Sequence, residues 1–203
     1  LADNPLIFDH GNSALRVLHE NHHMYDTSNN VTITGAVSGA STTLAAALDS
    51  TATTFTLTSA TDFDDTSGKF SNNTSGEWFV KIDDEIIKYT AISSTTVSSA
   101  VRGQNATTAV AHSAGATVEF FMLHGVPLTE INKTHNAIAN IGIDSYTVTL
   151  TTSPVISGGS TTAQNGGDSV TATENALFDT ANTQIGTLKL PKTNITTKVR
   201  PMT

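Results

Sequence analysis

The sequence contains no cysteine, few charged residues and no long apolar run. The absence of cysteine excludes disulfide bonds and thiolate metal sites. Only 14% of the residues are Asp, Glu, Lys or Arg, against about 25% in an ordinary soluble domain. The net charge of −8 argues against a nucleic-acid partner, because binding a phosphate backbone requires a concentrated basic face. No apolar segment approaches the roughly 18 residues of a membrane-spanning helix, so we expect no membrane span.

Threonine and serine replace the missing charges and make up about a quarter of the chain. Threonine is β-branched, so it packs well on a pleated sheet while its hydroxyl still faces water. Short alternating or β-branched segments recur at 31–35, 53–58, 78–82, 85–92, 95–97, 116–121, 145–151, 187–190 and 195–199. Such strands, separated by polar turns, predict an all-β protein made of small sandwich-like or barrel-like modules.

Two segments depart from the strand pattern. Residues 13–20 fit two turns of helix after a cap at Asn12 or Ser13, so we expect one short N-terminal helix. Residues 157–167 are rich in Gly, Ser and Thr, a composition that predicts a flexible loop.

The expected strands divide the chain into two units. Residues 40–122 form a β block of a size suited to a small domain. We predict that this block is inserted into a discontinuous β domain made of residues 1–39 and 123–203. Because the chain begins at Leu1 and ends at Thr203 without clear terminal signals, we also expect it to be a fragment of a longer protein.

Several short motifs follow one another in a characteristic order along the chain. Residues 82–89 (IDDEIIKY), 102–109 (RGQNATTA) and 112–118 (HSAGATV) resemble a β module that recurs in phage tail and baseplate proteins. The flanking segments 9–11, 30–35, 125–135 and 174–179 resemble large virion structural proteins of T-even-like phages that infect marine cyanobacteria. The resemblance covers most of the chain. It implies a part of the tail, baseplate or fibres, and it does not imply an enzyme.

A long loop in this module carries four residues suited to fixing its conformation. Gly103 and Gly115 permit backbone angles that other residues avoid, and Arg102 can donate five hydrogen bonds from a rigid fork. His112 can donate or accept at two ring nitrogens. We therefore predict a structural role for these residues, with docking of a neighbouring subunit as the alternative.

The other candidate sites favour structural interpretations. His19, His22 and His23 form the one cluster of metal-capable side chains, but their spacing matches no known zinc motif, and we expect hydrogen bonding instead of metal binding. The acidic residues at 62–65 and 83–85 supply the paired carboxylates that a glycosidase needs. Acidic turn tips are common for local reasons, so we expect neither catalytic residues nor a cofactor.

These observations lead to one main functional hypothesis. We expect a structural and assembly module of a virion, built in the cytoplasm of the bacterial host, whose partners are other virion proteins and copies of itself. The alternative is a module of a fibre or adhesin that binds a receptor or a host-surface glycan. A polysaccharide-degrading tail enzyme is a third class and would need an acidic cleft with measurable turnover. The particular virion part, the host and the oligomeric symmetry are left open by the sequence.

Overall fold

The computed structural model is almost entirely β, as the sequence predicts. It describes residues 1–203 except 2, 21, 25–26, 62–76, 157–160 and 176–203. The strands expected at 187–190 and 195–199 lie outside the described residues. The sheets within the described part are small, antiparallel and open, and none closes into a barrel.

Two sheets belong to the segments before residue 40 and after residue 122. The first has the order β15-β2-β1-β16 and the second has the order β14-β3-β17. Their strands are β1 (Leu6–Asp9), β2 (Asn12–Leu18), β3 (Asn30–Thr34), β14 (Thr134–His135), β15 (Ser145–Thr149), β16 (Thr162–Asn165) and β17 (Thr171–Asn175). Segments far apart in sequence therefore pair, because β2 lies between β1 and β15 and β3 lies between β14 and β17.

The predicted N-terminal helix is wrong, since most of that segment is strand β2. Leu15 and Val17 are fully buried while Arg16 between them is exposed, which is the two-residue period of a strand. Over this short length the apolar residues of the segment fit the period of a helix as well as that of a strand. Pairing with strands on both sides favours the extended form. The only helix in the described residues is α1 (Leu128–Ile131).

The predicted flexible loop at 157–167 is wrong over residues 162–165, which form β16. This strand pairs with β1 in antiparallel register, from Leu6 opposite Asn165 to Asp9 opposite Thr162. Its Thr-Ala-Gln-Asn sequence has weak intrinsic strand preference, so the pairing with β1 and not local composition determines its conformation.

The sheets of residues 40–122 include the hairpin that the sequence predicts. A five-stranded sheet has the order β10-β7-β6-β11-β4, and a three-stranded sheet has the order β5-β9-β8. Their strands are β4 (Ser41–Thr43), β5 (Phe55–Thr56), β6 (Trp78–Ile82), β7 (Glu85–Tyr89), β8 (Ala91–Ser93), β9 (Thr96–Ser98), β10 (Val101–Gln104) and β11 (Thr117–Phe120). A two-stranded ribbon of β12 (Met122–Leu123) and β13 (Val126–Pro127) follows.

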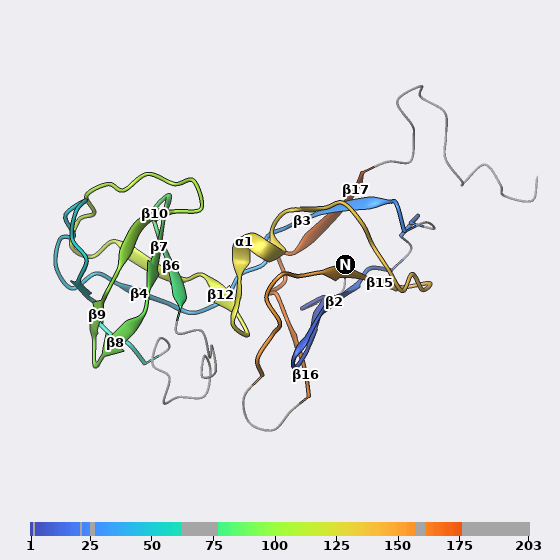
Figure 1. Ribbon diagram of the computed structural model, residues 1–203, viewed down its shortest axis with the longest axis horizontal. Coiled ribbons are helices and arrows are strands. Elements are labelled where there is room, and N and C mark those ends of the chain that lie inside the picture. The colour runs from blue at the N-terminus through green and yellow to red at the C-terminus, as the bar shows by residue number, and fades with distance from the viewer. Residues whose placement is uncertain (2, 21, 25–26, 62–76, 157–160, 176–203) are drawn as a thin grey trace, which may run out of the picture.

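The buried apolar residues form two separate clusters. One draws on both ends of the described chain, from Leu6 to Ala36 and from Leu123 to Val170. The other contains residues from Ala40 to Met122. Figure 1 shows the two groups of strands side by side, with β12 and α1 between them. The chain passes from one cluster to the other between Ala36 and Ala40 and returns between Met122 and Leu123.

Limited proteolysis of the full chain is expected to release a protected fragment close to residues 40–122. Each cluster buries its own apolar side chains, and the segment around Val37 belongs to no strand while Val37 itself is 48% exposed. Mass spectrometry of the stable fragments measures the boundaries. A protected piece that extends far beyond residues 40–122 would show that the two clusters unfold as one unit and that the predicted insertion is wrong.

Candidate functional site

The site is built on the hairpin of β6 and β7. Asp83 and Asp84 form its turn, and Asp83 has a left-handed φ of +52°. The next residue, Glu85, begins β7 opposite Ile82, and its side chain is fully buried. Alternation along β7 places Glu85 on the same face as the buried Ile87 and Tyr89. A buried carboxylate requires strong partners, and the long loop of the module supplies them.

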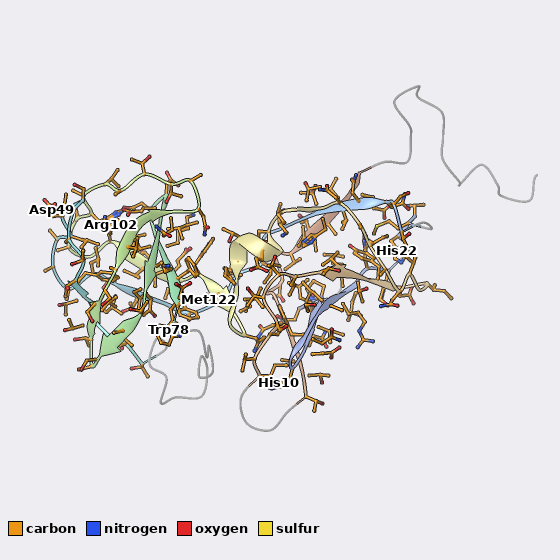
Figure 2. All side chains as sticks on the ribbon, in the orientation of Figure 1. His10, His22, Asp49, Trp78, Arg102 and Met122 are labelled. Carbon is orange, nitrogen blue, oxygen red and sulfur yellow. The ribbon has the colours of Figure 1, made fainter. Side chains whose placement is uncertain are left out.

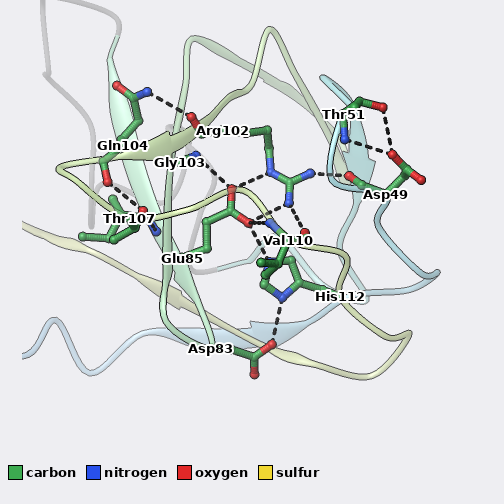
Figure 3. Close-up of polar contacts among 11 residues, drawn as sticks. Asp49, Thr51, Asp83, Glu85, Arg102, Gly103, Gln104, Thr107, Val110 and His112 are labelled. Atoms are coloured by element: carbon green, nitrogen blue, oxygen red, sulfur yellow. Dashed lines mark hydrogen bonds and ion pairs between the residues drawn. The ribbon is translucent and has the colours of Figure 1, made fainter.

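Arg102 binds Glu85 from the neighbouring strand β10 (Figure 3). Its Nε donates to Oε1 of Glu85 at 2.8 Å and its Nη2 donates to Oε2 at 2.7 Å, the paired geometry in which an arginine–carboxylate contact is strongest. The same guanidinium donates to the backbone carbonyls of Asp49 and Val110. The Arg102 side chain therefore joins three segments of the block: the hairpin, the loop after β4 and the loop after β10.

His112 lies between two carboxylates. Its Nδ1 is 2.8 Å from Oδ2 of Asp83 and its Nε2 is 2.8 Å from Oε2 of Glu85, and its side chain is fully buried. Ionised carboxylate oxygens only accept hydrogen bonds. Each ring nitrogen is within hydrogen-bonding distance of one carboxylate, so the imidazole joins the turn residue Asp83 to Glu85, the first residue of β7. Within the cluster, the buried Glu85 carboxylate is paired with the Arg102 guanidinium.

The backbone around the cluster completes the binding of Glu85. The amide of Gly103 donates to Oε1 at 2.9 Å, and the amide of Val110 donates to Oε2 at 3.2 Å. Burial raises the pKa of the Glu85 carboxyl, but hydrogen bonds from Arg102, His112 and these two amides outweigh it and lower the pKa from 4.5 to about 2. Glu85 is thus ionised throughout the neutral and mildly acidic range.

The two glycines of the loop have different structural roles. Gly103 has a φ of +61°, and a Cβ there would lie 3.0 Å from the Thr107 carbonyl oxygen. Gly115 has a φ of +83° with open space around it, and its amide donates to the Leu44 carbonyl at 2.8 Å. Both positions need a left-handed backbone, and Gly103 also permits a close approach of two chain segments.

The four loop residues singled out from the sequence are therefore placed in different ways. Arg102, Gly103 and His112 come together around one carboxylate, whereas Gly115 lies outside that cluster and shapes the return of the chain to β11. Sequence reasoning placed Glu85 at the start of the strand segment 85–92 and grouped it with the acidic turn residues, but it missed the role of Glu85 at the centre of the cluster. Alternation in β7 was the signal that could have identified it, because it puts a charged residue on an apolar face.

The loop presents an exposed outer surface while these contacts fix its inner side. Asn105, Ala106, Thr108 and Ala111 are exposed, and Val110 is 44% exposed. In Figure 2, Arg102 and Asp49 mark this end of the block, far from His10 and His22 in the other group of strands. The arrangement can hold one loop conformation at the surface, which suits protein recognition better than chemistry at a fully buried imidazole.

Two of the three clustered histidines, His19 and His23, lie beside Glu174 of β17. His23 lies 3.6 Å from its carboxylate and His19 lies 4.0 Å from it, while the backbone amide of His23 donates to it at 3.0 Å. The His22 ring packs edge-on against Tyr146 at 5.4 Å, and both of its nitrogens are buried without a hydrogen-bond partner. Burial lowers the pKa of His19, although the Glu174 carboxylate opposes this.

This histidine cluster does not form a metal centre in the part of the chain that the structure describes. No group of three His, Cys, Asp or Glu side chains there has a geometry that could hold a metal ion. Strand β2 ends at Leu18, and His19, His22 and His23 follow it outside any strand or helix. The contacts instead connect the segment after β2 to β15 and β17.

The remaining candidates from the sequence are two groups of acidic residues. The acidic residues at 62–65 lie outside the described residues. In the second group, Asp83 and Asp84 form the hairpin turn, and Asp83 and Glu85 bind within the ion cluster. No helix within the described ranges is long and apolar enough to cross a membrane.

Comparison of the chain with models of known protein families, with curated proteins and with solved structures finds no match. The fold and the site define an all-β protein with a loop fixed by a buried ion cluster.

Proposed function

We propose that this chain is a structural and assembly module of a tailed-phage virion, in the tail, baseplate or fibres, where it binds other virion proteins and copies of itself. The resemblance of its motifs to phage tail and baseplate proteins supports this function. The Thr-rich β composition supports it too, as does a loop that is held in one conformation while its outer surface is exposed. In this proposal the module is assembled in the cytoplasm of the bacterial host.

The observation that carries the proposal is the position of β17. Within the described residues this strand has one strand neighbour, β3, and it forms the edge of its sheet. An edge strand offers backbone N–H and C=O groups to an additional strand, and proteins use such edges for assembly when they do not block them. The residues that face solvent on β17 are the small and uncharged Thr171 and Thr173, which do not block pairing.

Replacing Thr173 with Lys is expected to reduce incorporation into particles by about tenfold while the isolated chain still folds. A lysine on an edge strand opposes strand addition, because its charge must be desolvated by the incoming chain. Thr173 is exposed, so the fold itself has room for the longer side chain. The measurement is quantitative mass spectrometry of purified particles assembled with the variant, together with circular dichroism of the isolated protein.

Thr117→Lys is the matched control. Thr117 is also exposed, but it lies in β11, which has β6 on one side and β4 on the other and so offers no free edge. Assembly should tolerate this change. Absence of the protein from purified particles would overturn the virion proposal itself, and saturable sugar binding by the isolated chain would favour the receptor- or glycan-binding alternative.

A further inference from the structure

The strand β16 ends in the only Asn-Gly pair of the sequence, Asn165-Gly166. An asparagine followed by glycine can react with its own backbone, because the next amide nitrogen can attack the side-chain carbonyl carbon and glycine offers no side chain to obstruct it. The conformation around Asn165 determines whether the folded protein permits this reaction.

The structure places the reacting groups close together. The Gly166 amide nitrogen lies 3.3 Å from Oδ1 of Asn165, so the nitrogen faces the side-chain carbonyl group that it would attack. Nδ2 of Asn165 lies 3.1 Å from Nε2 of His124. These two contacts fix the amide with its oxygen towards Gly166 and its leaving group towards an imidazole.

The backbone of Gly166 keeps this geometry. Its φ is +117°, a conformation that suits only glycine, and a Cβ there would lie 3.0 Å from the Leu6 side chain. The carbonyl of Gly166 accepts from the Val37 amide at 3.1 Å, and the Gly167 amide donates to Oδ1 of Asn4 at 3.0 Å. The turn is thus held from both sides in the arrangement that brings its nitrogen to Asn165.

We propose that Asn165 is a site of spontaneous deamidation promoted by the native fold. The Gly166 nitrogen loses its proton to water and bonds to Cγ of Asn165, while the Cγ–Nδ2 bond breaks. The departing nitrogen takes up a proton and leaves as ammonia, with the His124 imidazole positioned to relay that proton. Water then opens the resulting succinimide at either carbonyl and gives aspartate or isoaspartate. The net reaction consumes one water and releases one ammonia, with no oxidation or reduction.

The product would alter the connection between the two groups of strands. Isoaspartate routes the main chain through the side-chain carbons, so the pairing of Asn165 with Leu6 loses its register. The Gly166 carbonyl would shift away from Val37, which lies in the segment leading to the 40–122 block. Deamidation is therefore a covalent change that loosens the edge of the first sheet and this connection as the protein ages.

The experiment incubates the full chain, folded or unfolded in urea, at mildly alkaline pH and follows the peptide containing Asn165 by mass spectrometry. Conversion of Asn165 raises the mass of this peptide by the difference between a hydroxyl and an amino group. The Asn165→Gln variant should not show this mass increase. We expect the folded chain to convert about threefold faster than the unfolded chain, because the fold holds the nitrogen beside the side-chain carbonyl group that it attacks. An equal or slower rate in the folded chain would overturn the proposal, since the fold would then protect Asn165.

Discussion

Replacing Arg102 with Ala is expected to lower the free energy of unfolding of the 40–122 block by about 3–5 kcal/mol. The change removes both hydrogen bonds from the guanidinium to Glu85 and its donations to the carbonyls of Asp49 and Val110. It leaves the fully buried Glu85 carboxylate without its strongest cation. Removal of one partner of a buried ion pair costs this much because the remaining charge stays desolvated.

The single tryptophan makes this loss measurable in the full chain. Trp78 lies in β6 and stacks on Tyr89 at 5.7 Å, so its fluorescence reports the unfolding of the 40–122 block and not of the other cluster. Urea titration followed at this tryptophan gives the midpoint and slope of the transition. A lower midpoint with an unchanged slope is the expected result for lost stability.

Lys88→Ala is the matched control for Arg102→Ala. Lys88 binds Glu77 at 2.7 Å, but the two side chains are 24% and 46% exposed. Solvent screens such a pair, and its loss should cost no more than about 1 kcal/mol. If Arg102→Ala costs as little as Lys88→Ala while particle assembly fails, Arg102 belongs to an interface with a neighbouring subunit and the structural interpretation is wrong.

The strands of the fold could be predicted where alternation was long and unambiguous. The hairpin of β6 and β7, β11 and β15 combine apolar alternation with β-branched residues, and each is present. Strand β2 could not be assigned, because four apolar residues within a short segment fit a helical face as well as a sheet face. Strands β16 and β17 depend on partners more than 100 residues away, β1 and β3, and no local pattern contains that information.

The hydrogen-bond donors of the site could be predicted from the sequence, but the carboxylate that accepts from them could not. Arg102, Gly103 and His112 attract attention because a long loop needs hydrogen-bond donors and unusual backbone angles. Glu85 looks like the last residue of an acidic turn, since Asp83 and Asp84 precede it. Only the placement of β10 and of the loop after it beside β7 shows that this carboxylate accepts from all three.

The acid response of the protein is expected to depend on Glu85. The pKa of its carboxyl is about 2 in the fold against 4.5 for the ordinary group, so the folded state binds fewer protons than the unfolded state between these values. The stabilisation is complete above about pH 4.5 and is lost as the pH falls through about 2. Over that window one group contributes a slope of up to about 1.4 kcal/mol per pH unit.

The comparison of the wild-type chain with Glu85→Gln isolates this contribution. Glutamine cannot ionise, so it leaves Arg102 without its carboxylate and His112 with the carboxylate of Asp83 alone, and the variant is less stable at neutral pH. All other acidic groups are common to both chains, and their effects cancel in the difference between the two curves. Urea unfolding followed at Trp78 should therefore give a difference that is constant above about pH 5 and shrinks towards pH 2. A difference that stays constant down to pH 2 would mean that the folded protein does not hold Glu85 ionised, and the role of the carboxylate as the acceptor for the whole loop would have to be abandoned.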